Sequence, residues 1–203
     1  MFENIFNPFR ETVFLKEDSN LDTDLIKLRE IRDKVKNRNE IDKDIKLIEL
    51  GIKGEAEIAY ELKNANLGLL VLRDITLEFQ GNKAQIDYII ITPVFTYYIE
   101  CKKLVGNIIV NDKGDFIREY IINGKKVRNG MYSPLRQVEA QREVIRKIWE
   151  DNTSSFQKIL ASKNFNHYNK VLVVAANQET ILNTCKAPKN IKNKVIRSDA
   201  LVR

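Results

Sequence analysis

The chain of 203 residues is 43% hydrophobic and 31% charged, which is typical of a globular protein with one core and a strongly charged surface. No stretch contains the roughly 18 to 20 uncharged apolar residues of a membrane span, and the N-terminal residues lack the basic start and apolar block of a secretory signal. Two cysteines and one histidine, His167, argue against a disulfide framework and against histidine-rich zinc chemistry, so we expect a cytoplasmic setting and oxygen ligands for any metal.

The net charge of +6 is unevenly distributed along the chain. Residues 1–120 contain 18 Lys and Arg against 22 Asp and Glu, whereas residues 121–203 contain 16 against 6, which gives net charges of −4 and +10. A basic C-terminal part can attract the phosphate backbone of a nucleic acid. A lysine-rich surface that only interacts with solvent would have the same composition, so charge alone leaves both interpretations open.

The N-terminal part is expected to lie outside the main domain. Residues 1–20 have no clear periodicity and are predicted to form a tail or an edge element. Residues 21–37 carry apolar side chains at helical spacing, with acidic residues near the start and basic residues near the end, as the helix dipole favours. This amphipathic helix could pack on the body of the domain or bind another chain, in a homo-oligomer or with a protein partner. We therefore divide the chain into an N-terminal tail and helix, 1–41, and a main domain, 42–203.

A second helix is predicted from about residue 42 to residue 64. Its apolar face carries Ile52, Ile58 and Ala59, and Glu55 falls on the same face at helical spacing. An acid within an apolar stripe costs free energy unless another group compensates it, which makes Glu55 a candidate site residue. Alternatively, Glu55 could lie at the edge of the stripe and reach solvent.

The middle of the chain has the pattern of a β-meander that is followed by helices and further strands. Strand-like segments separated by Gly- and Asn-containing turns are predicted at 69–79, 84–92, 95–103, 106–111 and 115–124. Ser133 and Pro134 have the residue types of a helix start, so a helix is predicted from there to about residue 150. A short helix at about 154–163, a buried strand at 169–177, and a strand with the start of a helix at 192–203 follow. This order indicates an α/β fold with helices packed on a mixed sheet.

The second and third of these segments place charged side chains within one of the most apolar parts of the sequence. If they form an antiparallel hairpin that turns at Pro93 and Val94, Asp87 lies opposite Glu100 and on the same face. Lys102, two residues after Glu100, shares this face. A turn longer or shorter by one residue would put the two carboxylates on opposite faces, so the prediction depends on the strand register.

Asp87 and Glu100 need a compensating positive charge in this arrangement. Two ionised carboxylates about 5 Å apart repel each other by roughly 3 kcal/mol at an effective dielectric constant near 20. Either one of them binds a proton or a cation lies between them, and Mg²⁺ or Mn²⁺ suits such a pair of acids. With Lys102 to orient water or stabilise negative charge, the group would suit metal-assisted phosphodiester hydrolysis. A salt bridge from Lys102 to a carboxylate on a solvent-facing sheet is the alternative.

Four segments resemble the NERD (nuclease-related) domain in order and spacing: GIKGEAEIAYEL, AQIDYIIITP, YYIECKK followed by GNI, and SPLRQVEAQ. This family is assigned to the PD-(D/E)xK, restriction-endonuclease-like superfamily of nucleases. The resemblance covers roughly residues 50–145, extends more weakly through the strand at 170–176, and leaves residues 1–40 outside. It implies a central mixed sheet flanked by helices, and Mg²⁺-dependent cleavage of DNA.

The resemblance also implies roles for individual residues. Asp87 matches the metal-binding aspartate, Glu100 and Lys102 match the Glu-x-Lys pair, and Glu55 matches the acid on the first helix. Cys101 would provide its main-chain carbonyl to the metal while its side chain packs in the core.

Gln137 resembles the glutamine of the family's Pro-x-x-Gln helix, although it could also be a boundary residue that hydrogen-bonds to the backbone. The sequence departs from the family at Tyr88, where His is frequent, and at the turn 92–95, where Gly is frequent. Neither departure removes a candidate ligand.

Two functions are consistent with these residues. The first is a metal-dependent nuclease that hydrolyses phosphodiester bonds, with DNA as the expected substrate, Mg²⁺ or Mn²⁺ as the cofactor and no membrane partner. The second is a non-catalytic module that keeps the nuclease fold and binds nucleic acid or another protein.

Overall fold

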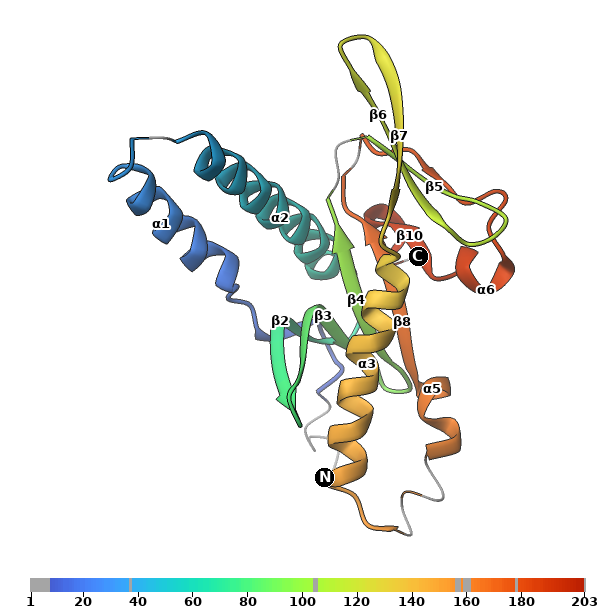
Figure 1. Cartoon of the computed structure of the whole chain (residues 1–203). Helices are drawn as coiled ribbons and strands as arrows, with labels where there is room; N and C mark the ends of the chain where they lie inside the picture. Colours follow the sequence, from blue (N-terminus) through green and yellow to red (C-terminus); the bar gives the residue numbers. More distant parts are fainter. Residues whose placement is uncertain are drawn as a thin grey trace.

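The computed structural model describes residues 8–36, 38–103, 106–155, 158, 162–177 and 179–202. Within these residues a central sheet has six strands in the order β1-β2-β3-β4-β8-β10 (Figure 1). These strands are β1 (Val13–Lys16), β2 (Leu70–Phe79), β3 (Asn82–Ile91), β4 (Thr96–Lys102), β8 (Asn169–Ala175) and β10 (Val195–Arg197). β2, β3 and β4 are antiparallel neighbours, whereas β1 is parallel to β2, and β4, β8 and β10 are parallel to one another. The predicted mixed sheet is thus confirmed.

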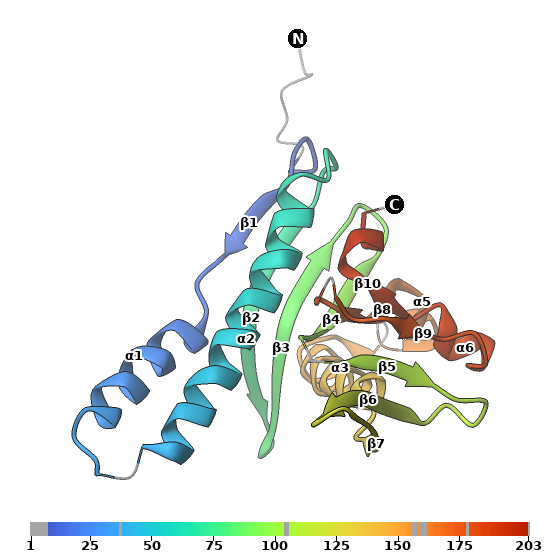
Figure 2. The ribbon, with the colours of Figure 1, turned by 90° about the horizontal axis from the view of Figure 1, so that it is seen from above.

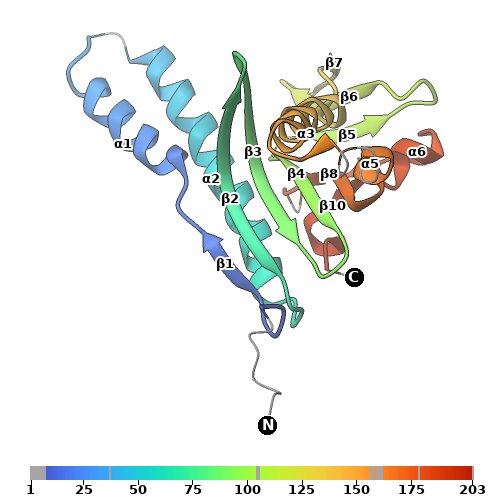
Figure 3. The same ribbon diagram turned by 90° about the horizontal axis from the view of Figure 1, so that it is seen from below.

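Two long helices cover opposite faces of the central sheet (Figure 3). The helix α2 (Asn39–Lys63) packs on one face, where Ile58 and Leu62 join a core with side chains of β2, β3, β4 and β8. The helix α3 (Pro134–Asp151) packs on the other face, where Leu135 and Val138 contact a second core cluster. Ser133 accepts a hydrogen bond from the Arg136 N–H at 3.3 Å, which confirms the predicted start of α3. Burial on both faces explains why β3 and β4 are so apolar.

A second, smaller sheet packs beside α3 and has the strand order β7-β6-β5-β9 (Figure 2). Its strands are β5 (Asn107–Val110), β6 (Phe116–Ile122), β7 (Lys125–Met131) and β9 (Leu182–Asn183). The sequence predicted β5 and β6 but missed β7. Because the residues of β7 are mostly exposed and include three basic side chains and a glycine, they lack the alternating apolar pattern that identifies a half-buried strand.

The N-terminal helix α1 (Asn20–Arg32) lies alongside α2 and forms a helical hairpin with it (Figure 2). Its first turn is held by the buried Asp74 of β2, whose carboxylate accepts a hydrogen bond from the Asn20 N–H at 2.6 Å. The predicted helix extended to residue 37, but it ends earlier because the chain must reverse before α2 begins at Asn39. Residues 13–16 form the edge strand β1, in agreement with the predicted tail or edge element.

The C-terminal part contains only short helices besides its strands, as far as the structure describes it. They are the 3₁₀ turns Ser162–Asn164 and Ser198–Ala200 and the helices α5 (Phe165–Tyr168) and α6 (Lys189–Lys192). Half of the predicted helix at 154–163 lies outside the described residues; of the others, residues 155 and 158 are helical and residues 162–163 belong to a 3₁₀ turn. Across the described ranges, no helix combines the length and the apolar character that crossing a membrane would require.

We predict that Gly106, at the start of β5, is required for the second sheet to dock on the end of β4. Its φ of +101° is unfavourable for other residues, and a Cβ atom there would lie 2.4 Å from the main-chain oxygen of Glu119. Gly106→Ala should lower the free energy of unfolding by about 3 kcal/mol or more, measured by urea denaturation.

Gly81→Ala is the matched control for this prediction. Gly81 also has a positive φ, +75°, but an added Cβ would meet no atom within 4 Å. This substitution should cost only about 1 kcal/mol. Equal losses for the two variants would contradict the predicted collision with Glu119.

Candidate active site

The strand register places Asp87 opposite Glu100, as the sequence predicted. The turn closes through a hydrogen bond from the Thr92 N–H to the Phe95 carbonyl at 2.8 Å, and Tyr88 pairs with Ile99. This is the last pair between the two strands. Beyond it, β3 continues along β2 to Asn82, whereas β4 continues along β8, so that a gap opens between β3 and β4 (Figure 3).

A cavity of about 250 Å³ lies at this gap. Its lining comes from α1, α2, β3, the end of β4 and α3, and comprises Leu21, Gly51, Glu55, Gln85, Asp87, Glu100, Cys101, Lys102, Lys103, Gln137 and Gln141. The structure therefore brings together all six predicted site residues, which are Glu55, Asp87, Glu100, Cys101, Lys102 and Gln137. Their chemical roles stay predictions.

Asp87 bridges the gap between the two strands. Its Oδ2 atom accepts a hydrogen bond from the Cys101 N–H at 2.7 Å and so replaces a backbone carbonyl of the interrupted ladder. The carbonyl of Lys102 points away from Asp87, toward β8, because it accepts a hydrogen bond from the Ala176 N–H at 3.1 Å. Since successive carbonyls of a strand alternate in direction, the Cys101 carbonyl points to the side of Asp87, as a metal ligand shared with Asp87 would require. The Cys101 side chain packs against the α2-side core, as expected.

Glu100 is almost completely buried and is held by three side chains. Its Oε1 atom accepts a hydrogen bond from the Lys102 ammonium, and its Oε2 atom accepts one from the Gln141 amide at 3.4 Å. Lys102 also donates to Gln137 Oε1 at 3.3 Å. The alternative interpretation is right about the salt bridge, since Lys102 pairs with Glu100, but wrong about a solvent-facing sheet, because the Glu100 side chain is only 3% exposed and faces α3.

Burial raises the pKa of both carboxylates above their ordinary values. For Asp87 the loss of solvent is the largest cause and repulsion from Glu100 the next, and together they raise its pKa to about 8. For Glu100 burial also raises the pKa, while the charge and hydrogen bond of Lys102 oppose this effect. The pair is therefore deficient in positive charge at neutral pH, which is the condition under which acids bind a cation or a proton.

Glu55 reaches the cavity from the α2 side of the sheet. Its side chain is 8% exposed, so the alternative in which it reaches solvent at the edge of the helix is wrong. Its Oε2 atom accepts a hydrogen bond from Arg73 Nε at 2.8 Å, and its main-chain carbonyl accepts one from the Tyr88 hydroxyl at 2.8 Å. Burial raises the pKa of Glu55, and Arg73 opposes this rise.

Two cavity residues and the ion partner of Glu55 were missed by the sequence analysis. Gln141 and Gln85 are connected by a hydrogen bond from the Gln141 amide to the Gln85 carbonyl at 2.5 Å. A signal for Gln141 was its position one helical turn after Gln137, on the same face. The signal for Arg73 was a charged residue directly after the apolar run Leu70–Leu72 at the start of β2.

Gly54 allows α2 to approach the end of β4 closely. A Cβ atom at this position would lie 2.7 Å from the Cβ of Lys103 and 3.2 Å from the Cys101 sulfur. Lys103 in turn forms an ion pair with Glu57, one turn along the same helix. This contact fixes the end of β4 relative to α2 and hence relative to Glu55.

The donor atoms at the gap fit a magnesium ion. Within the described residues no three His, Cys, Asp or Glu side chains converge as a metal site. The cavity instead provides the carboxylates of Asp87 and Glu100 and the Cys101 carbonyl, and Mg²⁺ characteristically binds one or two carboxylates and keeps several waters. The buried Gln141 Oε1 atom has no hydrogen-bond partner among the described residues, so a water molecule in this cavity would satisfy it.

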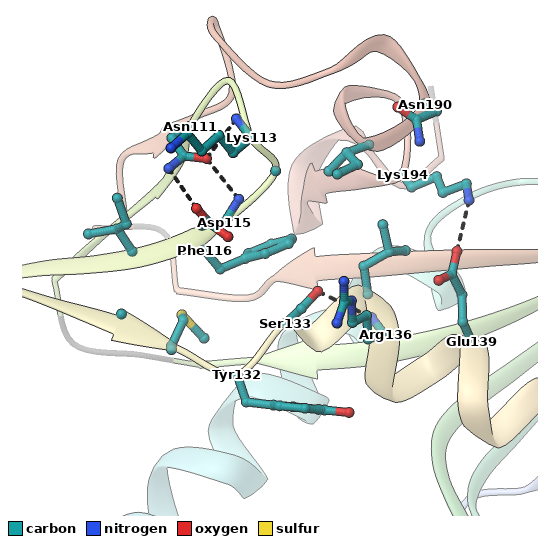
Figure 4. A pocket seen from close by; sticks show the side chains of 16 residues that line it. Asn111, Lys113, Asp115, Phe116, Tyr132, Ser133, Arg136, Glu139, Asn190 and Lys194 are labelled. Carbon is teal, nitrogen blue, oxygen red and sulfur yellow. Dashed lines mark hydrogen bonds and ion pairs between the residues drawn. The ribbon is translucent and has the colours of Figure 1, made fainter.

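A larger cavity, of about 660 Å³, lies between the β5–β6 turn, the start of α3 and α6 (Figure 4). Four of its charged and polar side chains are paired: Lys194 pairs with Glu139 at 3.0 Å, and Asn111 donates to Asp115 at 3.0 Å. The predicted site residues are not part of its described lining. We therefore assign the candidate active site to the smaller cavity, where the predicted site residues converge and burial raises the pKa of three acids.

Comparison with protein families matches residues 50–182 to the model described as "NERD: Nuclease-related domain". This range is more than half of the chain and contains every predicted site residue. Comparisons with curated proteins and with solved structures give no match.

We predict that Asp87→Asn stabilises the metal-free protein at pH 8. Since the pKa of Asp87 is raised to about 8 by folding, the unfolded chain releases this proton at lower pH than the folded one, so stability is lost as the pH rises from about 4 to 8. The amide keeps an oxygen for the Cys101 N–H but carries no charge. The gain should be about 1 kcal/mol or more at pH 8, and it should vanish near pH 4.

Urea denaturation at several pH values, with chelator present, measures this effect. The exposed Asp44 offers a control, since Asp44→Asn should change stability little at any of these pH values. A gain that is equal at pH 4 and pH 8 would rule out the repulsive carboxylate as its cause.

Proposed function

Because the chain belongs to the nuclease-related domain family, we propose that it is a metal-dependent nuclease that hydrolyses phosphodiester bonds in DNA. One observation carries the proposal: the buried Glu100, the partly buried Asp87 and a lysine converge where β3 and β4 part, and the charges of the two carboxylates are incompletely compensated. Family membership alone supports a nuclease-related function. The donor set and the charge of the cavity support the more specific reaction.

Asp87, Glu100 and the Cys101 carbonyl would hold Mg²⁺ or Mn²⁺. When bound, the ion supplies positive charge for the scissile phosphate. The protein's own contribution is to fix these oxygen atoms before the substrate arrives. The Cys101 N–H orients the Asp87 carboxylate, and the Gln141 amide orients Glu100. Preorganised donors of this kind act most strongly in a site from which water is largely excluded.

Lys102 would stabilise the negative charge that develops on the phosphate. Its ammonium lies on the same face as Glu100 and is 24% exposed, so it can reach both the carboxylate and a substrate outside the cavity. Gln137 Oε1 accepts a hydrogen bond from this ammonium and so limits its movement. Gln141 Oε1 is available to accept a hydrogen bond from the attacking water.

Glu55 would hold water molecules in place and would not abstract a proton. Its carboxylate already accepts a hydrogen bond from Arg73, which keeps a counter-charge next to it. From the α2 side it adds negative charge to the cavity and raises the pKa of Asp87 slightly further. We therefore assign Glu55 to holding water molecules at the rear of the site.

A non-catalytic nucleic-acid-binding module is the alternative, and the net charge of +10 in residues 121–203 favours it. Such a module would bind DNA in a salt-dependent manner, and binding would persist when Asp87 and Glu100 are neutralised. The nuclease requires these two carboxylates for cleavage. Binding and cleavage measured on the same variants therefore separate the two functions.

Lys102→Ala and Glu100→Gln should each lower the cleavage rate by about 100-fold or more, because each removes charge from the reacting centre. Cleavage of labelled duplex, single-stranded and branched DNA in Mg²⁺ or Mn²⁺ measures this, with chelator as the blank. Lys34→Ala on the exposed connection after α1 is the control and should cleave like the wild type. Wild-type protein that leaves all three substrates intact would exclude the nuclease.

Mn²⁺ should raise the melting temperature of the wild-type protein more than that of Asp87→Asn. A ligand at 100 times its dissociation constant stabilises a folded protein by about 2.7 kcal/mol. The variant has lost one carboxylate, so its shift at the same Mn²⁺ concentration should be much smaller. Asp44→Asn should shift like the wild type, and equal shifts for all three proteins would place Mn²⁺ elsewhere.

A further inference from the structure

The hairpin of β6 and β7 projects from the molecule as a two-stranded ribbon, which we call the arm (Phe116–Met131; Figure 1). β5 pairs with β6 only up to Glu119, so within the described residues the outer half of the arm has no third strand. Asn123 and Gly124 at its tip both have positive φ, +50° and +74°, the conformation of a tight hairpin turn that matches the strand twist. An isolated two-stranded ribbon is only marginally stable in water, which points to a partner.

The arm is basic, and neighbouring side chains hold several of its cationic groups in place. It contains four basic residues and one acidic residue, Glu119. Glu119 accepts a hydrogen bond from Arg128 at 2.6 Å and lies 3.2 Å from Lys126, which holds these two long side chains in place. The Arg118 guanidinium stacks over the Tyr120 ring at 4.9 Å. Cations fixed in this way lose less conformational entropy when they contact phosphates.

The tip of the arm is apolar although it is exposed. The side chains of Ile121 and Ile122 are 73% and 50% exposed, and each faces a lysine across the ribbon, Lys126 and Lys125. An exposed isoleucine beside a lysine on each face of the ribbon suits a surface that offers both phosphates and apolar groups. A nucleic-acid groove has this combination, since thymine methyl groups line the major groove of DNA.

The arm is connected at both ends to the candidate active site. β4, which carries Glu100 and Lys102, ends just before β5, and β7 leads through two residues into α3, which carries Gln137. Gly106 packs directly on the main chain of Glu119 and so fixes the base of the arm to this end of β4. Figure 1 shows the arm at the end of the molecule toward which β4 runs, so a nucleic acid held by the arm lies near the residues at the end of β4.

We propose that the arm enters the major groove of double-stranded DNA and holds the duplex over the candidate active site. The major groove of B-form DNA is about 12 Å wide and admits a two-stranded ribbon, whereas the deep, narrow major groove of duplex RNA does not. The ribbon enters tip first, so that its two faces turn toward the two walls of the groove. Lys126 and Ile121 contact phosphates and base edges from one face, and Lys125 and Ile122 do so from the other. This inference rests on the proposed nuclease function and adds to it the form of the substrate.

The test compares arm variants with a control that removes the same charge elsewhere. The Kd of the full chain for a labelled DNA duplex and for an RNA duplex of the same sequence is measured by fluorescence anisotropy, with chelator present and at several salt concentrations. The arm variants are Lys125→Ala/Lys126→Ala and Ile121→Ser/Ile122→Ser. The control is Lys34→Ala/Lys43→Ala, at exposed positions of the helical hairpin.

The lysine variant of the arm should bind the DNA duplex about ten-fold more weakly. The slope of log K against log salt concentration should be shallower by about 2 for this variant, one unit for each lost phosphate contact. The isoleucine variant should also bind more weakly but keep the wild-type salt dependence. The control should bind like the wild type, and duplex RNA should bind weakly and respond to none of the substitutions. Arm variants that bind DNA like the wild type, or a control that loses as much affinity, would overturn the proposal. So would duplex RNA that binds through the arm as tightly as DNA.

Cleavage assays separate this inference from the nuclease function. If the wild type binds duplex DNA through the arm but cuts no substrate in Mg²⁺ or Mn²⁺, DNA binding by the arm is confirmed and the nuclease function is wrong. If the wild type cuts DNA while the arm variants bind and cut equally well, the nuclease function is confirmed and DNA binding by the arm is wrong.

Discussion

The hydrogen bond from the Cys101 N–H to the Asp87 carboxylate is the interaction on which the candidate active site depends. It forms because β3 and β4 stop pairing after Tyr88 and Ile99, which frees one backbone donor of β4. A buried N–H needs an acceptor, and here a side chain supplies it. The same bond closes the edge of the gap and fixes Asp87 beside the Cys101 carbonyl. The geometry of the candidate site thus follows from an interrupted strand ladder.

The gap also explains why residues from both faces of the sheet reach one cavity. Glu55 comes from α2, whereas Gln137 and Gln141 come from α3, and an uninterrupted sheet would separate them. The close approach at Gly54 fixes α2 to the end of β4. The second sheet and its arm start from the same end, so the elements that form the site also orient the surface that we propose binds DNA.

Two buried acids, Glu55 and Glu100, and the partly buried Asp87 make the site costly for the folded protein. Burial raises the pKa of Glu55, Asp87 and Glu100, and among these acids Glu55 and Glu100 accept hydrogen bonds from cationic side chains. Asp87 accepts one only from a backbone N–H among the described residues. Its charge is therefore the least compensated of the three, which makes it the strongest candidate to attract a divalent cation. Active sites commonly hold such destabilising groups because binding relieves them.

The sequence by itself determined the register of the central hairpin only on the condition of a two-residue turn at Pro93 and Val94, because a turn longer or shorter by one residue would separate Asp87 from Glu100. It therefore predicted that Asp87, Glu100 and Lys102 share a face, and helical periodicity placed Glu55 toward the sheet. Only the tertiary structure decided where β3 and β4 part and which cations accompany the acids. It also decided that residues 116–131 form an arm of a second sheet. These features depend on packing between segments distant in sequence, and local sequence patterns do not predict such contacts.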